Sequence, residues 1–401
     1  MRLDHPLLMQ VPLDVLARLA IDFAKATPEE PAYLLLDELT YARDWDLWLK
    51  TFHDERWPIR LAGSSSSTAA LRDRRTESGV GRWEEQYLAP YLFGEFLPLT
   101  GRNATVSVGS SLPETLAACI SAAPDVVLLK PLRDAYVLTG GFPELLTPLD
   151  APEPDLADVL LRSQRTLQND AVDRAIYKDI PQAFGVDSPL LLERMLYTLA
   201  GQMTGVLTPT GLCRTLGLSW PTFDRYLSYL IRAFLVFTLP NYAGSEPAKQ
   251  KRGRKLYFVD GAVRNAALQR GTLPLGDPGE MGLLLENLVA AHLHALGQQT
   301  QVRLYHWRQK RAEVDLIYDE PDRPMAFEVA GSLRHSREGL RRLMEAFPRF
   351  EGGCYLVAPD ALPTAPGDGR DGIGSLPLDL LLLAVSGQAE HELQLRLAGD
   401  S

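Results

Sequence analysis

An unbroken apolar run that ends in two acids constrains the fold more than any other feature of the sequence. Tyr33-Leu34-Leu35-Leu36 is followed directly by Asp37-Glu38. A short continuous run of this kind is typical of a fully buried parallel strand, and the carboxyl end of such a strand is where α/β sheets place their functional groups. Apolar residues at helical spacing from Trp45 to Phe52 then lead to a second short strand, Ile59–Ala62. The pattern predicts a strand–helix–strand unit.

The second strand runs directly into Gly63-Ser64-Ser65. Because neighbouring parallel strands end at the same edge of a sheet, we expect these hydroxyls to lie beside Asp37 and Glu38. Mg²⁺ needs a carboxylate ligand, and an attacking water needs a neighbouring acid. The two strand ends therefore predict part of a nucleotide-hydrolysing site; an acidic strand end without chemistry is the alternative.

The wider stretch resembles one prokaryotic AAA ATPase family. The matching segments are Leu34–Glu38, Trp45, Ala62–Ser65, Gly81-Arg82, Phe93–Phe96 and Gly140–Pro143. The resemblance implies ATP and Mg²⁺ as cofactors, with Asp37 binding Mg²⁺, Glu38 polarising water, and Ser64 or Ser65 sensing the γ-phosphate. It also implies Arg82 as an arginine finger at a subunit boundary; an arginine on a solvated loop is the alternative.

One part of the family pattern is missing from the sequence. No G-x-x-x-x-G-K-[ST] occurs in the 401 residues, so the backbone nest and lysine that hold the phosphates are not supplied. In the family this loop precedes the region where the chain begins, as though Met1 were an internal methionine of a truncated protein. We therefore expect negligible ATP binding by this polypeptide.

The middle of the chain reads as helical. Residues from about 150 to 200 predict helices, and Gly211–Tyr242 predicts a helix–turn–helix with its turn at Gly217. A basic turn then precedes a strand at Leu256–Val259, as in a winged helix; its cations are Lys249, Lys251, Arg252, Arg254 and Lys255. Thr222, Asp224 and Arg225 could contact DNA, but packing between flanking domains is favoured because the chain is acidic.

The C-terminal part predicts a compact mixed sheet. A helix from Glu280 to Gly297, with Gly297 as its left-handed cap, precedes strands at 302–307, 313–318 and 325–330. A helix to about Phe347 and a strand at 354–357 follow. The segment Pro359–Pro377, rich in Gly, Pro and Asp, predicts a surface loop before a terminal helical stretch.

Acids on this sheet predict a second candidate site. Asp315 and Glu328 lie on strands where they could converge, and Glu286 on the preceding helix could add a third carboxylate for Mg²⁺ or Mn²⁺. The segments Leu285–Val289, Tyr305–Arg308, Glu313–Asp315 and Phe327–Val329 resemble a domain of unknown function that follows such AAA modules and has a core similar to PD-(D/E)-x-K nucleases.

The nuclease-like pattern also lacks its lysine. The resemblance implies a lysine two residues after the second acid, where this chain has Ala330. A methyl group cannot orient or deprotonate water. We therefore expect a structural or inactive role rather than an active nuclease, unless Lys310 or Arg334 substitutes.

Composition narrows the remaining function classes. A net charge of −10 and a pI near 5.3 oppose a broad electrostatic grip on nucleic acid. Cys119, Cys213 and Cys354 form no zinc or disulfide pattern, and His292 and His294 at i, i+2 do not predict a zinc site. No export signal or membrane-spanning run is evident, which predicts a cytoplasmic protein.

The predicted fold is α/β: a partial P-loop NTPase-like parallel sheet, a helical and winged-helix middle, and a C-terminal mixed-sheet, restriction-endonuclease-like domain. The predicted domains are 1–145 (AAA core), 146–265 (helical lid and winged helix), 278–360 (nuclease-like) and 361–401 (loop and terminal helix). The first functional hypothesis is an AAA-family ATPase-like protein; the alternatives are a non-enzymatic DNA- or protein-binding remnant and a metal-dependent nuclease. A second copy of the chain or a client protein is the expected partner, with no membrane.

Overall fold

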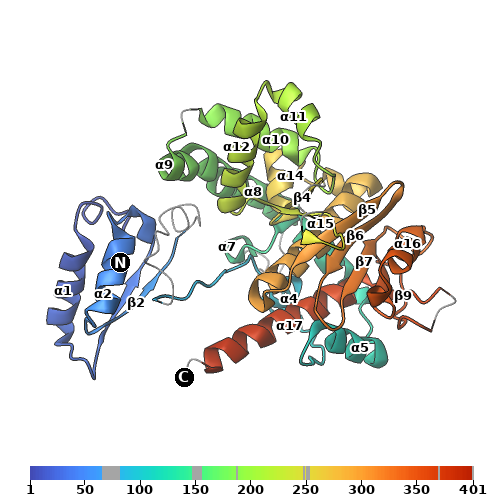
Figure 1. Ribbon diagram of the computed structural model, residues 1–401, viewed down its shortest axis with the longest axis horizontal. Helices are drawn as coiled ribbons and strands as arrows, with labels where there is room; N and C mark the ends of the chain where they lie inside the picture. The colour runs from blue at the N-terminus through green and yellow to red at the C-terminus, as the bar shows by residue number, and fades with distance from the viewer. Residues whose placement is uncertain are drawn as a thin grey trace. The chain divides into compact units, whose positions relative to one another are not determined.

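The computed structural model describes residues 1–65, 82–146, 156–186, 188–246, 249, 253–368 and 371–399. These residues form two compact units (Figure 1). Unit 1 comprises Met1–Gln86, Ala175–Pro189 and Arg225–Phe234, and unit 2 comprises Tyr87–Arg174, Leu190–Asp224 and Leu235–Ser401. About 52% of the structure is helical, and the predicted α/β class is confirmed. Gly81, Lys251 and Arg252, named above, lie outside the described residues.

Unit 1 is built on the predicted strand–helix–strand segment. Its elements along the N-terminal segment are α1 (Leu13–Ala24), β1 (Ala32–Leu36), η1 (Leu39–Tyr41), α2 (Trp45–Asp54) and β2 (Ile59–Gly63). β1 and β2 pair in parallel, with Leu36 opposite Gly63. One face of this pair packs against apolar residues of α1 and α2, and among them Trp45 is almost fully buried. The parallel sheet predicted from the two apolar runs is therefore present.

β1 is buried on one face only, so the prediction of a fully buried strand was wrong. Leu34 and Leu36 are buried, whereas Tyr33 is 78% exposed and Leu35 66% exposed. Successive side chains of a strand point to opposite faces, and only alternate residues reach the core of unit 1. An all-apolar run hides this alternation from a reader of the sequence.

Helices dominate the first half of unit 2 and the segments of unit 1 between them. Among the described residues they are α4 (Phe93–Leu99), α5 (Leu112–Ala122), η2 (Val127–Leu129), α6 (Lys130–Thr139), α7 (Pro143–Leu146), α8 (Leu156–Thr166), η4 (Leu167–Asp173), η5 (Ala175–Asp179), α9 (Ile180–Phe184), α10 (Pro189–Ala200), α11 (Pro209–Leu216) and α12 (Trp220–Arg232). No single described helix is long and apolar enough to cross a bilayer, although the bent pair Leu112–Ala122 and Val127–Thr139 satisfies the length and composition test together.

The predicted helix–turn–helix corresponds to α11 and α12. Gly217 adopts the left-handed conformation that ends α11, with φ of 69°. β3 (Val236–Leu239) then pairs antiparallel with β4 (Lys255–Phe258). The assignment of this segment as a winged helix stays a prediction.

A five-stranded mixed sheet forms the C-terminal part of unit 2. Its surrounding helices are α14 (Gly261–Ala267), η6 (Leu273–Gly276), α15 (Pro278–Thr300), α16 (Glu338–Ala346), η7 (Pro348–Phe350) and α17 (Leu378–Gly399). Its strands, in spatial order, are β5 (Leu304–Gln309), β6 (Ala312–Tyr318), β7 (Met325–Val329), β8 (Cys354–Ala358) and β9 (Gly374–Pro377). β5, β6 and β7 are antiparallel, whereas β7, β8 and β9 are parallel. The predicted mixed sheet is confirmed.

Two sequence predictions in this region were wrong. The segment Pro359–Pro377 is not loop throughout, because its last four residues form β9, buried and parallel to β8. Gly297 does not cap its helix, since α15 continues to Thr300 and Gln301 is the left-handed cap with φ of 58°. An added Cβ at Gly297 would lie 2.8 Å from the Val302 carbonyl oxygen, so the glycine permits close packing of the chain that returns past the helix.

α17 is joined to helices from much earlier in the chain. The Gly94 amide donates to Ser386 Oγ at 3.0 Å, and Thr115 Oγ1 donates to Gln388 Oε1 at 2.6 Å. The Arg133 guanidinium donates to both oxygens of Asp379, at 2.9 and 3.1 Å, and this pair is buried. These links span 246 to 292 residues of sequence. The core of unit 2 therefore combines residues from both ends of its sequence.

Candidate functional site

Lys255, predicted above to be part of a basic turn, lies at the centre of the predicted acidic cluster. β4 directs Lys255 into unit 2, where its side chain is only 2% exposed. Its Nζ lies 2.7 Å from Asp315 Oδ1, 2.9 Å from Glu286 Oε1 and 3.1 Å from Glu313 Oε1. Three carboxyl groups from α15 and β6 thus surround one ammonium group.

Neighbouring groups hold this cluster in place. Tyr257, two residues after Lys255 on β4, donates its hydroxyl to Glu286 Oε1 at 2.9 Å. The Val329 amide of β7 donates to Asp315 Oδ2 at 3.0 Å. Burial by itself lowers the pKa of Lys255, but Tyr257 and the carboxyl groups of Asp315 and Glu286 raise it well above its ordinary value. Lys255 is therefore a cation at neutral pH.

Burial gives two of the acids pKa values at or above neutral pH. Burial, with Asp315 as the next contributor, raises the pKa of Glu286 to about 7 and that of Glu328 to about 9. Glu328 Oε1 contacts His335 Nε2 at 3.1 Å, and Glu328 Oε2 is buried without a hydrogen-bond partner. Glu313 is the most open of the four acids, with a side chain 33% exposed. The cluster consequently opens toward solvent at Glu313 and at the half-exposed His335.

The structure brings the predicted metal ligands Glu286, Asp315 and Glu328 into one cluster, but with Lys255 among them. Within the described ranges, no group of three or more His, Cys, Asp and Glu residues is arranged to hold a metal ion. The ammonium group of Lys255 lies between the carboxyl groups of Glu286 and Asp315 and balances their charge. Divalent metal binding at these residues stays a prediction.

Ala330 lies beside this cluster without contributing charge. It is buried, and its amide donates to the Val357 carbonyl at 2.9 Å, which continues the β7–β8 ladder. The cation of the site is instead Lys255 of β4, which precedes Ala330 by 75 positions in the sequence. The sequence signal for Lys255 was its alternation with Tyr257 in the strand Lys255–Phe258, which places both side chains on one face.

The candidate site of unit 1 is partly assembled as predicted. Ser64 Oγ donates to Asp37 Oδ1 at 2.5 Å, so the two strand ends meet. Glu38 is buried and has left-handed backbone geometry, with φ of 56°. Ser65 Oγ lies 3.4 Å from Thr40 Oγ1, which is a long contact for a hydrogen bond between hydroxyls. The structure therefore brings Asp37 and Ser64 together and directs Ser65 toward η1.

The side chain of Arg82 pairs with the last residue of α2. Its Nε donates to Asp54 Oδ1 at 2.8 Å and its Nη2 to Asp54 Oδ2 at 3.3 Å. Asp54 is the last residue of α2, whereas Asp37 follows β1. These contacts give Arg82 a structural pairing in unit 1, and a role as an arginine finger stays a prediction.

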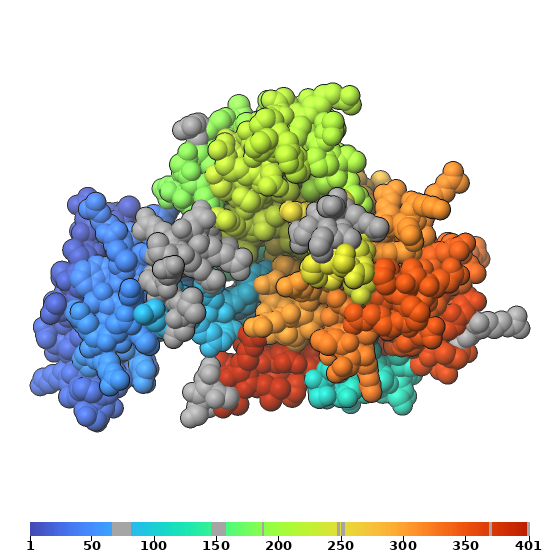
Figure 2. All heavy atoms as spheres, viewed as in Figure 1, coloured from blue at the N-terminus to red at the C-terminus, as the bar shows by residue number. Residues whose placement is uncertain are grey.

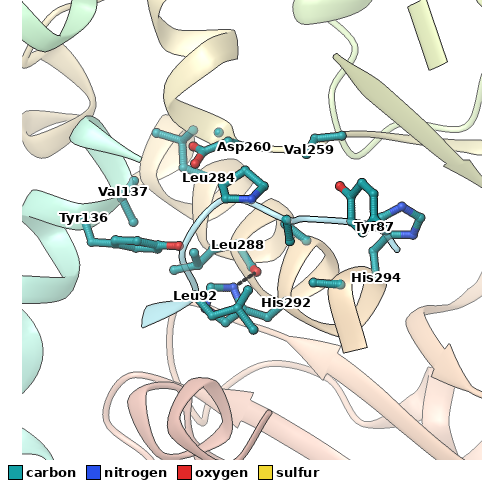
Figure 3. Close-up of a pocket in the computed structure, with 15 residues that line it drawn as sticks. Tyr87, Leu92, Tyr136, Val137, Val259, Asp260, Leu284, Leu288, His292 and His294 are labelled. Atoms are coloured by element: carbon teal, nitrogen blue, oxygen red, sulfur yellow. Dashed lines mark hydrogen bonds between the residues drawn. The ribbon is translucent and has the colours of Figure 1, made fainter. Parts of the chain in front are cut away.

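Unit 2 also contains a small pocket, shown in Figure 3, whose polar groups have structural roles. Asp260 begins α14 and accepts hydrogen bonds from the Gly141 and Ala262 amides, each at 2.8 Å. Burial raises the pKa of Asp260 to about 6 and lowers the pKa of His292 and of His294 to about 4. His292 Nε2 accepts from the Phe93 amide at 2.9 Å. Asp260 and His292 thus make their hydrogen bonds within the protein, and the Gly141 amide is one of the donors, which favours a structural explanation for Gly140-Gly141 in the family resemblance.

Three ranges of the chain match family models. Residues 2–97 match a model described as AAA domain, residues 131–273 match Domain of unknown function (DUF8612), and residues 281–368 match Domain of unknown function (DUF4143). The matches support an AAA-family, ATPase-like protein in which two domains of unknown function follow the AAA segment. AAA proteins in general use nucleotide and Mg²⁺.

Three similar proteins are each described as uncharacterized. The uncharacterized protein MJ1637 of Methanocaldococcus jannaschii is 26% identical over 302 residues, which cover 73% of this chain and 60% of that protein. MJ1544 of the same organism is 26% identical over 293 residues, with coverage of 72% and 58%. An uncharacterized protein of Haemophilus influenzae is 22% identical over 331 residues, with coverage of 80% and 72%. The chain thus spans about 60% of the length of the first two relatives.

One solved structure is also similar. Protein VC1899 from Vibrio cholerae is 13% identical, and the alignment covers 94% of this chain and 79% of that chain with a TM-score of 0.21.

Proposed function

We propose that the chain is an AAA-family, ATPase-like protein whose C-terminal part is a nuclease-like domain without hydrolytic activity. The observation that supports the inactive domain is the Lys255 ammonium, which lies within 3.1 Å of Glu286, Glu313 and Asp315. A divalent metal bound between these carboxylates would have to displace a buried cation that the chain itself supplies. Displacement would leave Lys255 buried without its partners, at a cost of several kcal/mol.

The proposal predicts no cutting of nucleic acid. The purified 401-residue chain, incubated with supercoiled plasmid and either Mg²⁺ or Mn²⁺, should nick no faster than its Asp315→Ala variant. The matched control is Asp368→Ala, which removes a carboxylate of the same domain outside the cluster. Nicking by the wild type and by Asp368→Ala, but not by Asp315→Ala, would contradict the proposal.

A metal-dependent nuclease is the second candidate, and one contact favours it. Lys255 Nζ is 2.7 Å from Asp315 Oδ1, so a lysine from β4 stands beside the acid where the family resemblance implies a lysine at position 330. In that case the plasmid would be nicked, and Lys255→Gln would abolish nicking together with Asp315→Ala. The same assay therefore separates the two functions.

Unit 1 supplies only part of a nucleotide site. The Asp37–Ser64 pair fits the metal side of such a site, because a carboxylate and a hydroxyl are oxygen ligands suited to Mg²⁺. The printed sequence contains no G-x-x-x-x-G-K-[ST] segment to hold the phosphates. The residues present therefore do not complete a site for ATP, and we infer no hydrolytic step from them.

Nucleotide binding by the 401-residue chain is expected to be negligible. Titration with a fluorescent ATP analogue and Mg²⁺ should give no saturation in the micromolar range, because a triphosphate would meet Asp37 and Glu38 without a compensating amide nest or lysine. Micromolar binding that Asp37→Ala removes would contradict this expectation. An Asp44→Ala variant, altered after η1 rather than at the strand end, provides the matched control.

A further inference from the structure

Two short segments of unit 2 carry an unusual concentration of positive charge. The β5–β6 turn reads Arg308-Gln309-Lys310-Arg311, and the segment before α16 reads Arg334-His335-Ser336-Arg337. Five of these eight residues are Lys or Arg and none is acidic, in a chain whose net charge is −10. We call these two segments the basic rim.

The two segments of the basic rim lie next to each other. Gly339, two residues after Arg337, packs so closely on β6 that an added Cβ would lie 1.8 Å from the Glu313 carbonyl oxygen. Glu313 itself follows Arg311 by two residues. His335 contacts Glu328 of the acidic cluster. The basic rim therefore borders the side of the cluster that opens to solvent. Residues of this part of the sequence, coloured orange, form exposed surface in Figure 2.

The cations of the basic rim are available for a ligand. Lys310, Arg311 and Arg334 are exposed, and the described part of the chain offers no ion pair to any of them or to Arg337. Arg308 has only a 3.8 Å contact with Glu313.

The acids beside the basic rim have their own counter-ions. Glu338 is paired with Arg341 at 2.9 Å and with Arg342 at 2.8 Å. Glu313 shares Lys255 with the cluster behind it. Local repulsion of an anion is therefore smaller than the acid count of this region suggests.

We propose that the basic rim binds the phosphodiester backbone of nucleic acid without reading its sequence. Arginine guanidinium groups donate paired hydrogen bonds to phosphate oxygens, and Gln309 and Ser336 add neutral donors beside them. Neither segment contains a Phe, Tyr or Trp on which a base could stack. The inference goes beyond the proposed function, because it depends on the surface charges and not on whether the cluster cuts a bond.

A membrane surface fits these observations less well. Peripheral membrane sites combine cations with apolar side chains that enter the lipid. The exposed large apolar side chains of the described residues include none between Leu275 and Leu362. The basic rim thus lacks an anchor of that kind, and contact with phosphate groups in water is the better match.

The test measures binding of the full chain to a labelled duplex by fluorescence anisotropy in EDTA, which stops metal-dependent cutting. With a duplex of about 30 base pairs at about 50 mM NaCl, we expect saturable binding. The logarithm of the binding constant should fall linearly with the logarithm of the salt concentration, with a slope of about −0.9 for each phosphate contacted. The variant Arg311→Gln/Arg334→Gln should bind at least about tenfold more weakly, with a slope flatter by about 2.

The matched control removes the same charge from the helix–turn–helix. Arg214→Gln/Arg225→Gln alters two exposed arginines of α11 and α12 and should leave duplex affinity within about twofold of wild type. The proposal is overturned if the control variant loses binding instead, if the Arg311/Arg334 variant binds as wild type does, or if no duplex binding occurs. Tighter binding to phosphatidylserine vesicles or to polyglutamate than to the duplex would equally reject nucleic acid as the partner. Because no metal is present, none of these outcomes depends on the absence of nuclease activity.

Discussion

Replacing Lys255 with methionine should destabilise unit 2 by about 3–5 kcal/mol at pH 8, because removal of one partner from a buried ionic cluster leaves the others uncompensated. Methionine keeps most of the volume of the lysine stem, so the lost charge dominates over lost packing. Glu286, Glu313 and Asp315 would then face one another without a cation. Urea unfolding followed by circular dichroism and by tryptophan fluorescence measures the change, since Trp307 is buried in the same sheet domain.

Two further variants make the Lys255 result interpretable. Lys310→Met removes a lysine from the exposed β5–β6 turn and should change stability by less than about 0.5 kcal/mol. Lys255→Met combined with Glu286→Gln and Asp315→Asn should recover part of the loss, because fewer charges remain unpaired. If Lys255→Met matched wild type within about 1 kcal/mol, the cluster would not depend on its central cation.

Glu328 should make the protein less stable as the pH rises from about 5 to 9. Its pKa is raised to about 9 in the folded protein from an ordinary value of 4.5, chiefly by burial. The folded state therefore binds more protons than the unfolded state between these values, so stability is full below pH 4.5 and is lost as the pH rises through 9. We expect a loss of about 2–4 kcal/mol between pH 5 and pH 8, because each pH unit over which only the folded state keeps this proton costs up to about 1.4 kcal/mol.

The Glu328→Gln variant tests this dependence. Glutamine cannot ionise, so the variant should be more stable than wild type at pH 8 and nearly equal to it at pH 5. Glu286, whose pKa is raised to about 7, remains in the variant and keeps part of the slope below pH 7. Thermal unfolding measured at intervals from pH 5 to 9 compares the curves, and Glu345→Gln on the exposed face of α16 is the control. Parallel curves for wild type and Glu328→Gln would show that the carboxyl group is already ionised at neutral pH.

The parts of the fold that could be predicted are those with a local periodic signal. Leu34–Leu36, Trp45–Phe52 and Ile59–Ala62 each show a strand or helix pattern, and β1, α2 and β2 lie where the patterns indicated. The meeting of Asp37 with Ser64 followed from the parallel arrangement of the two strands. These predictions needed no contact between distant segments other than strand pairing.

The features that were missed depend on distant contacts. β9 is four residues long and is recognised as a strand only because it pairs with β8. Glycine is a common residue at helix C-termini, so Gly297 was predicted to end its helix. It lies inside α15 instead, where the close packing of Val302 and Leu304 explains the need for a glycine. Lys255 looked like one more cation of a basic turn until β4 placed it against acids 31 to 60 residues later, from Glu286 to Asp315. Sequence alone gives no distance between such groups.

The long-range links of α17 determine when unit 2 can finish folding during synthesis. Gly94, Thr115 and Arg133 bind partners on a helix that is translated 246 to 292 residues later. At about 5–20 residues per second, these earlier helices leave the ribosome on the order of 12–60 seconds before α17 is available. Throughout that interval the apolar surface that α17 later covers lacks its native partner, and exposed surface of this kind makes a folding chain prone to aggregation.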